Sequence, residues 1–152
     1  RSKVANGQPL LSAPYGIYDT ADGHIAIAMM DIHVLADTIG CLGLKDFSKQ
    51  EAFSRRDEIK TVLANHLLKQ TTDYWLGLLQ DAGLWSMHVL NWEEMTNETA
   101  YQSLGMEQKI KVGEKEITTT RCPIRINGER LVSGRRAPGV GEHNELIKEE
   151  LL

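Results

Sequence analysis

The sequence predicts an α+β fold in which helices pack on a short antiparallel sheet. Three observations favour this class: a strand precedes the first helix, amphipathic helical patterns fill the first half, and strand patterns dominate the second half. Strands and helices do not alternate regularly, so a parallel βαβ architecture is not expected. With 152 residues, of which 41% are hydrophobic, the chain can bury a core without disulfides or metals.

A hairpin opens the predicted sheet. Asp22-Gly23 is a turn signal, because glycine readily takes the positive φ that tight hairpin turns require. The apolar run over residues 24–30 predicts a buried strand, and residues 17 and 18 are its expected partner. The prolines and glycines before them make residues 1–19 a connecting segment.

The first predicted helix follows this strand directly. Asp31 stands at the N-cap position, and Gly40 and Gly43 end the helix. Apolar residues recur at helical spacing between them, at Ile32, Leu35, Ala36, Ile39 and Leu42.

Two more helices are predicted in the first half. Residues 54–57 form a variant capping box, with Asp57 in place of the usual Glu, and Thr72 is the expected cap of the third helix, which ends at Gly83. Their apolar faces are formed by Ile59, Val62, Leu63 and Leu67, and by Trp75, Leu76, Leu78 and Leu79.

The second half predicts shorter elements. Residues 86–90 favour a strand, Asn91 caps one helical turn, and Asn97 caps a short helix that reaches Leu104. Residues 108–112 and 115–120 flank Gly113 as a hairpin, residues 121–141 are loop-like, and residues 142–152 predict an acidic amphipathic helix.

Composition excludes several classes of function. A net charge of −4 gives no general attraction to nucleic acid or anionic lipid, and no apolar run reaches the roughly 18–20 residues of a membrane span. The first residues lack an apolar signal-peptide core and resemble the middle of a longer polypeptide. Cys41 and Cys122 show no CxxC spacing, so reduced thiols are expected. We therefore expect a soluble, globular, cytoplasmic domain.

Local motifs for metal or thiol chemistry are weak. Asp31 and His33 could be half of a metal site, but a capped helix start beside a solvated histidine is the stronger interpretation, because metal sites need three or four ligands. Cys122 beside Arg121 could have a lowered pKa, yet no histidine stands near enough in the sequence to activate it. We expect no metal and a packed, unreactive cysteine.

A cationic stretch covers residues 107–136. Eight basic residues stand there against four glutamates, a net charge of +4. A phosphate-bearing ligand could use this charge, but the stretch has no aromatic residues for stacking, so a solvated hairpin face is the stronger interpretation. The basic residues are Lys109, Lys111, Lys115, Arg121, Arg125, Arg130, Arg135 and Arg136.

Asp31 is a candidate functional residue because of its position in the predicted fold. It stands where an apolar strand ends and a helix begins, and strand ends of this kind often carry functional groups. The alternative is a plain N-cap, which needs no further role.

The order of these segments resembles the C-terminal half of the family III CoA transferases, over residues 9–150. This family includes formyl-CoA and carnitine CoA transferases and the α-methylacyl-CoA racemases. Two anchors carry the resemblance: Tyr18-Asp19-Thr20-Ala21-Asp22-Gly23 before an apolar strand, and Ala137-Pro138-Gly139-Val140-Gly141-Glu142-His143 before the last helix. Between them, Leu42-Gly43-Leu44, Arg55-Arg56-Asp57, Trp75 and Ala82-Gly83 follow in the same order.

The resemblance implies a two-domain enzyme. Family members build a Rossmann-like large domain from both ends of the chain, carry a smaller domain between them, and interlock as homodimers. Residues 20–115 then correspond to the small domain, and residues 116–152 to the segment that returns to the large domain.

The resemblance also implies a reaction. In the transferases an aspartate attacks an acyl-CoA thioester to give a mixed anhydride, and CoA is then exchanged through an enzyme thioester, which moves it between carboxylic acids. CoA is a substrate in this reaction, and no cofactor is held tightly. No aspartate of this chain matches the motif of the nucleophile. The chain is therefore expected to be an inactive fragment, whose partners are acyl-CoA, a carboxylic acid and the N-terminal half of the same polypeptide.

Two further parts of the family's active site have possible counterparts in this chain. In the racemases a carboxylate follows the strand after Thr-Ala-Asp-Gly and supports the proton-transfer pair, and Asp31 falls on that position, with Asp in place of Glu. The transferases have a glycine-rich loop in this region, for which only Gly7 and Gly16 are available. Three functions stay open: a CoA transferase fragment, a racemase fragment, or a non-catalytic binding module. Bare apolar surface around residues 117–140 and along the last helix would disfavour the module.

Overall fold

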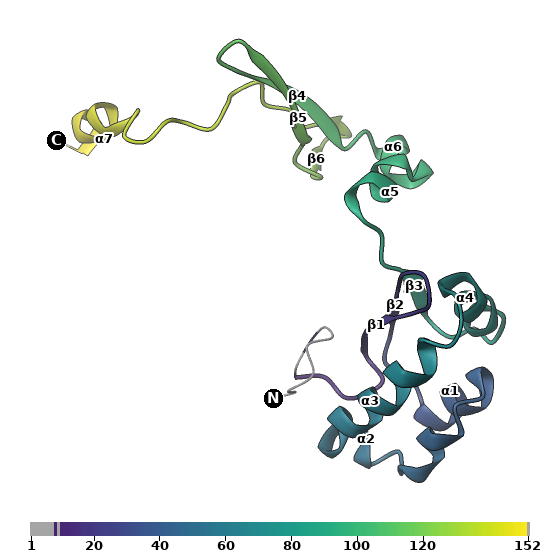
Figure 1. Ribbon diagram of the computed structural model, residues 1–152. Helices are drawn as coiled ribbons and strands as arrows, with labels where there is room; N and C mark the ends of the chain where they lie inside the picture. The colour runs from purple at the N-terminus through teal and green to yellow at the C-terminus, as the bar shows by residue number, and fades with distance from the viewer. Residues whose placement is uncertain (1–7, 9, 152) are drawn as a thin grey trace. The chain divides into compact units, whose positions relative to one another are not determined.

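The computed structural model describes residue 8 and residues 10–151, and the chain forms two compact units (Figure 1). Unit 1 ends at Asn91 and unit 2 begins at Trp92. Residue 115, the last of the segment expected to correspond to the small domain, lies within unit 2, in a strand that pairs with its neighbour as an antiparallel hairpin. As the sequence predicts, the fold is α+β with small antiparallel sheets.

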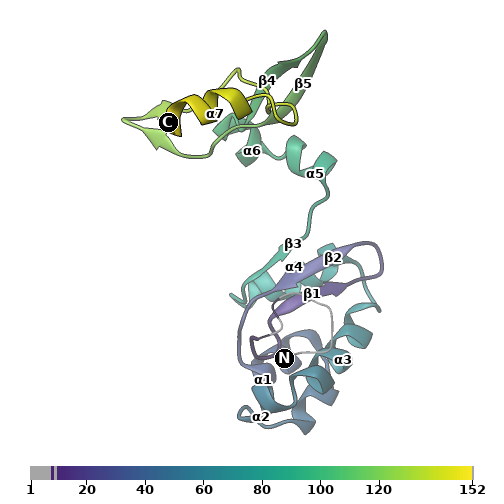
Figure 2. The ribbon, with the colours of Figure 1, turned by 90° about the vertical axis from the view of Figure 1, so that its left-hand side faces the viewer.

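The sheet of unit 1 has three antiparallel strands in the order β1-β2-β3 (Figure 2). They are β1 (Gly16–Asp19), β2 (His24–Ile27) and β3 (Ser86–His88). The register pairs Ile17 with Ala26, and Ala26 with Met87, so these three side chains share one face. The predicted hairpin is confirmed, although β2 and β3 are shorter than expected.

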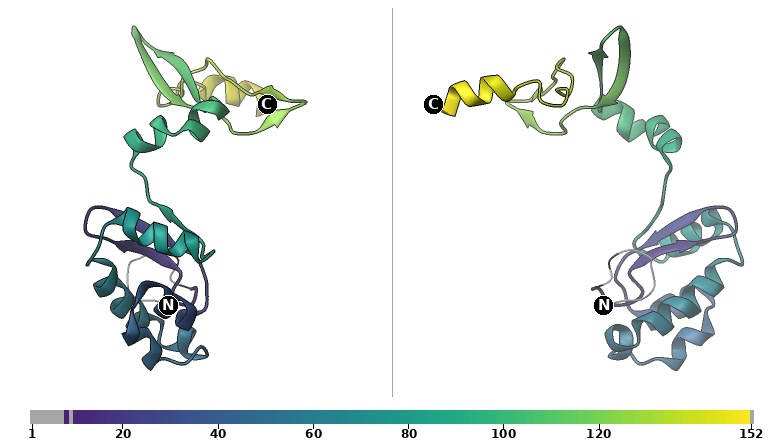
Figure 3. Two further views of the ribbon diagram at one scale, coloured as in Figure 1. Left: turned by 90° about the vertical axis from the view of Figure 1, so that its right-hand side faces the viewer. Right: turned by 60° about the vertical axis from the view of Figure 1, so that its left-hand side comes forward.

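Five helical segments accompany this sheet, and α3 and α4 have the most extensive backbone contact with it (Figure 3). The segments are α1 (Ile32–Ile39), the 3₁₀ helix η1 (Leu42–Asp46), α2 (Glu51–Ser54), α3 (Arg56–Leu67) and α4 (Thr72–Asp81). α1 begins and ends as predicted, because Asp31 caps its first turn and Gly40 takes a φ of +70° at its end. Leu42 belongs to η1 rather than to α1.

The start of α3 differs from the prediction. Ser54 ends the short helix α2, and Arg55 precedes α3 without a side-chain cap, so the predicted capping box is wrong. The chain instead has four unpredicted helical residues before α3. At α4 the cap is Thr71, whose hydroxyl accepts the N–H of Tyr74, and Thr72 is the first helical residue.

The core of unit 1 lies between the helices and one face of the sheet. Ile25 and Ile27 of β2 meet the apolar faces of α1, α3 and α4 there, and the buried set includes Leu35, Ile59, Leu63, Leu67, Trp75 and Leu79. Lys60 shares this environment. Its Nζ is buried without a hydrogen-bond partner in the part of the chain that the structure describes, and burial lowers its pKa.

The Thr-Ala-Asp-Gly segment ties the β1–β2 turn to α4. Oδ1 of Asp22 accepts the backbone N–H of Thr72 at 2.8 Å, and the hydroxyls of Thr20 and Thr72 lie 2.6 Å apart. A side chain at Gly23 would place its Cβ 3.1 Å from the Thr72 hydroxyl, so glycine permits this close approach. The motif thus has a structural function in this unit: it caps α4 from a turn fifty residues away.

Asp22→Ala is expected to destabilise unit 1 in a pH-dependent way. The pKa of the Asp22 carboxyl lies below its ordinary value of 3.8, chiefly because the Thr72 N–H donates to it. A lowered pKa in the folded state means that the charged carboxylate stabilises the fold above the ordinary pKa, and that this contribution disappears as the pH falls through the lowered value.

Urea unfolding at pH 7, 5 and 3 measures this effect. The wild-type chain should be more stable than Asp22→Ala at pH 7 and 5, and the difference should shrink at pH 3. Asp81→Ala, which removes an exposed carboxylate at the end of α4, is the matched control for the loss of a surface charge. A pH-independent difference for Asp22→Ala would contradict the role of the charge.

Unit 2 consists of short helices and hairpins, each formed by residues that are close in the sequence. They are α5 (Trp92–Asn97), α6 (Thr99–Leu104), β4 (Glu107–Val112), β5 (Lys115–Thr120), β6 (Arg125–Ile126), β7 (Glu129–Arg130) and α7 (Asn144–Leu151). The predicted hairpin is β4–β5. Glu98, not Asn97, occupies the N-cap of α6. The predicted loop over residues 121–141 also contains the small hairpin β6–β7, whose turn residues Asn127 and Gly128 both have positive φ.

The apolar residues of unit 2 are largely exposed. Of its described residues only Arg121 is buried. It donates to the carbonyls of Leu104 and Gly105 at the end of α6, and to the carbonyl of the adjacent Cys122. Large apolar side chains around residues 117–140 and along α7 face outward: Ile117, Ile124, Ile126, Val132, Val140, Leu146, Ile147 and Leu151. This is the bare surface that disfavours a self-contained binding module.

Candidate functional site

Asp31 connects β2 to α1 and is held from three sides. Its Oδ1 accepts the backbone N–H of His33 at 2.8 Å and that of Val34 at 3.4 Å, and its Oδ2 forms an ion pair with Lys49. The side chain is 29% exposed, so it is neither buried in the core nor freely solvated. The predicted strand-to-helix junction is therefore correct, and the N-cap role is present in the structure.

The charge of Asp31 follows from these contacts. The Lys49 ammonium group and the His33 N–H hold the pKa of the Asp31 carboxyl below its ordinary value. Asp31 is therefore ionised at neutral pH and cannot serve as a proton donor there. A fixed negative charge suits a different task, which is to orient or stabilise a neighbouring positive or proton-donating group.

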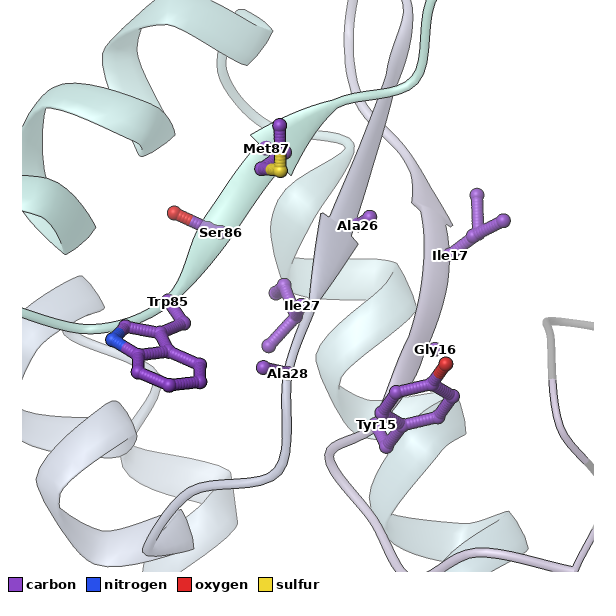
Figure 4. Close-up of a pocket in the computed structure, with 9 residues that line it drawn as sticks. All are labelled: Tyr15, Gly16, Ile17, Ala26, Ile27, Ala28, Trp85, Ser86 and Met87. Carbon is purple, nitrogen blue, oxygen red and sulfur yellow. The ribbon is translucent and has the colours of Figure 1, made fainter. Parts of the chain in front are cut away.

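An apolar groove lies on the face of the sheet opposite the core (Figure 4). Its floor is formed by the small side chains of Ala26 on β2 and of Ala28 directly after this strand. Tyr15 and Ile17 stand along one side of this floor, and Trp85 and Met87 along the other (Figure 4). The groove has a volume of about 320 Å³, which is at the lower end of the range for small-molecule sites.

The register of the sheet creates this groove. Ala26 pairs with Ile17 on one side and Met87 on the other, and the backbone N–H of Ala28 bonds to the carbonyl of Trp85 at 3.0 Å. Small residues on the central strand therefore lie between large residues on both neighbours. The sequence suggests the alternation along β2, but the third strand comes sixty residues later, so the groove was not predicted.

The groove and Asp31 belong to the same end of β2. Asp31 follows Ala28 by three residues, so their Cα atoms lie at most about 11 Å apart. Among the predicted residues, Asp31 is the one that follows the apolar groove along the chain, whereas Lys111, Arg135 and Arg136 line a separate polar hollow in unit 2.

The other sequence candidates lie elsewhere or have structural partners. Nε2 of His33 lies 2.7 Å from the carbonyl oxygen of Phe47, and the described residues contain no group of three potential metal ligands around Asp31 or anywhere else. Cys122 is exposed rather than packed, which corrects that prediction. Gly7 lies outside the described residues, while Gly16 is a buried strand residue paired with Ile27 and not part of a loop.

The cationic stretch is spread over a solvated surface. Lys109 pairs with Glu116 across the β4–β5 hairpin, and Arg136 donates to both oxygens of Glu142. Arg121 is the exception, because it caps α6 from within unit 2. Most of this charge therefore belongs to a solvated face, as the stronger interpretation predicts.

No aspartate in the described part of the chain is buried. Several have structural partners: Asp19 contacts His24, Asp37 contacts Lys45, and Asp73 contacts His88. A nucleophilic carboxylate works best in a dry pocket with oxyanion donors, and no aspartate within residues 10–151 has that environment. Within the same residues, no helix combines the length and apolarity needed to cross a membrane.

Comparison with known proteins identifies the family. The family model described as CoA-transferase family III matches residues 1–144. Human (Homo sapiens) alpha-methylacyl-CoA racemase is 29% identical over 154 residues, which cover 97% of this chain and 40% of that protein.

Solved structures agree with this relationship. A hypothetical protein from Mycobacterium tuberculosis, Rv3272, is 26% identical with a TM-score of 0.57, and the match covers 89% of this chain and 39% of that one. A CAIB/BAIF family protein from Brucella suis, 21% identical with a TM-score of 0.58, shares the fold over 99% of this chain and 40% of its own. The chain thus spans about 40% of the length of these relatives. With the family model matched over nearly the whole sequence, this chain belongs to CoA-transferase family III.

Proposed function

We propose that this chain is part of an enzyme that transfers CoA between carboxylic acids through an aspartyl-CoA intermediate. The family match over residues 1–144 is the observation that carries this proposal. The acyl-CoA thioester and the acceptor acid are its substrates, and the attacking aspartate lies in a part of the protein outside these residues. None of the described aspartates is buried, which supports that location, because a nucleophile of this type requires a water-poor pocket.

The exposed apolar surface of unit 2 also supports the proposal that part of the enzyme lies outside these residues. Apolar residues on β5, on the segment after it and on α7 find no core within the unit. Exposed apolar surface of this extent normally marks an interface. In our proposal the remaining part of the protein covers it, and the complete enzyme is a homodimer.

Racemisation of an acyl-CoA is the second candidate. Two observations favour it: the relative with 29% identity is a racemase, and Asp31 provides an ionised carboxylate at the junction where racemases have a supporting carboxylate. Gly16 adds to this, since it is a strand residue and cannot contribute to the glycine-rich loop of the transferases.

Two assays on the complete protein separate these reactions. CoA transfer is measured as exchange of CoA from succinyl-CoA or a branched acyl-CoA to a second carboxylic acid, and racemisation as incorporation of deuterium from solvent at the α-carbon of a 2-methylacyl-CoA. Transfer without deuterium incorporation supports the first proposal. Deuterium incorporation without transfer supports the second, and neither activity on any acyl-CoA overturns both.

A further inference from the structure

We propose that the groove on the open face of the β1–β3 sheet binds an uncharged aliphatic acyl chain, with the thioester end toward Ala28. This inference rests on the proposed action on acyl-CoA thioesters and adds the substrate class. It depends on the width, the lining and the direction of the groove.

The width fits one hydrocarbon chain. The large side chains stand on the two strands that flank β2, so they lie two strand spacings apart, about 9.6 Å. A chain in van der Waals contact with both sides needs about 7–8 Å between the flanking carbons. A helix needs about 10–12 Å for itself, and would rest on the rims rather than reach the alanine floor.

The lining selects against charge. The groove residues are Tyr15, Gly16, Ile17, Ala26, Ile27, Ala28, Trp85, Ser86 and Met87, none of which is charged. The Ser86 side chain lies opposite the buried Ile27 on the core face, so it does not line the floor. A dicarboxylic acyl group such as succinyl would bring its free carboxylate against Trp85, Met87 and Ile17 without a cation to pair with, which is strongly unfavourable.

The direction joins the groove to the candidate site. A chain along β2 has one end at Ala28, and Asp31 lies within about 11 Å of that residue. The opposite end passes Ala26 toward His24 and Asp19, which contact each other at 2.8 Å at the start of β2. A thioester at the Ala28 end therefore lies near the ionised carboxylate, and the aliphatic end points away from it.

Matched substrates and a groove-filling variant test this proposal in the complete protein. The substrate pair is 4-methylpentanoyl-CoA and succinyl-CoA, which have nearly the same shape but differ in charge. Wild-type protein should show kcat/KM about 100-fold higher for the uncharged member, because the carboxylate would be desolvated without a partner. Among straight-chain acyl-CoAs, kcat/KM should rise about fourfold per methylene until the groove is full.

Ala26→Phe fills the middle of the floor and should reduce the preference for 4-methylpentanoyl-CoA at least tenfold. Ala26→Val fills less of it, suits a strand, and should give an intermediate preference. Ala82→Phe adds the same ring to an exposed position after α4 and should leave the preference unchanged. Circular dichroism and the thermal midpoint of each variant confirm that it is folded.

Three other results overturn the inference. Equal kcat/KM for the two matched acyl-CoAs, or a preference for succinyl-CoA, shows that the groove does not select the chain. Ala26→Phe could also lower the thermal midpoint or the oligomeric state and reduce turnover of 4-methylpentanoyl-CoA and succinyl-CoA equally. That result would show that polypeptide, and not an acyl chain, covers the groove. If wild-type protein shows neither CoA transfer nor racemisation with any acyl-CoA, the proposed function itself fails, which distinguishes that case from the first two.

Discussion

Asp31→Asn is expected to lower the kcat/KM of the complete protein toward its acyl-CoA substrate by about 100-fold, a loss typical of removing one fixed electrostatic group. The substitution removes the negative charge at the end of β2 but keeps an oxygen that can accept the N–H of His33. Asparagine is as good an N-cap as aspartate, so the stability of α1 should hardly change. Steady-state kinetics and urea unfolding of the same samples measure the two effects separately.

Asp37→Asn is the matched control for this variant. Asp37 is also on α1 and also pairs with a lysine, Lys45, but it lies outside the junction. It should retain wild-type kcat/KM. Asp31→Glu, which keeps the charge, should retain most of the activity. Wild-type turnover by Asp31→Asn would show that Asp31 acts only as the N-cap of α1.

Leu63→Ala should destabilise unit 1 by about 2–5 kcal/mol, the usual range for a fully buried leucine. Leu63 is 0% exposed on α3, where it contacts the core that α1, α4 and the sheet share. The lost contacts and the cavity left behind both contribute to this cost. Urea unfolding of the 152-residue chain, followed by tryptophan fluorescence, reports on this unit, because Trp75 is the buried one of the three tryptophans and loses its apolar environment on unfolding.

Leu146→Ala makes the same chemical change in unit 2 with a different expected result. Leu146 of α7 is 58% exposed, so the change should stay within about 0.5 kcal/mol in this chain. In the complete protein the cost should rise, because the proposed function has another part of the enzyme cover α7. Equal costs for Leu63→Ala and Leu146→Ala in the 152-residue chain would show that unit 2 has a core of its own.

Unit 1 was largely predictable because its signals are local and agree with one another. Asp31 and Gly40 are typical of a helix start and end, and the spacing of Ile59, Leu63 and Leu67 places one face of α3 in the core. The short helix α2 was missed because its four residues are too few to show a period, and its N-cap Gln50 makes no side-chain cap bond.

Unit 2 illustrates a different limit. The Asn127-Gly128 pair is a strong signal for a two-residue hairpin turn, and it would have identified β6–β7 within the predicted loop. The exposure of α7 has no local signal of its own, because an amphipathic pattern predicts a buried face without naming what buries it. Here that face stays bare within unit 2.

The candidate site was predictable only in part. The carboxylate of Asp31 stands at a junction that the sequence marks by a strand followed by helical spacing. The groove depends on register between β2 and β3, which comes from pairing across sixty residues. The Lys49 partner of Asp31 also comes from the η1–α2 connection, and no motif links the two residues.

The most direct test compares acyl-CoA turnover by the 152-residue chain and by the complete protein that contains it. Both are assayed with succinyl-CoA and a branched acyl-CoA for CoA exchange and for deuterium incorporation, after circular dichroism has shown that unit 1 is folded. We expect turnover by the complete protein and none by the chain alone. Turnover by the isolated chain at the rate of the complete protein would show that the reacting groups lie within these residues, contrary to our proposal.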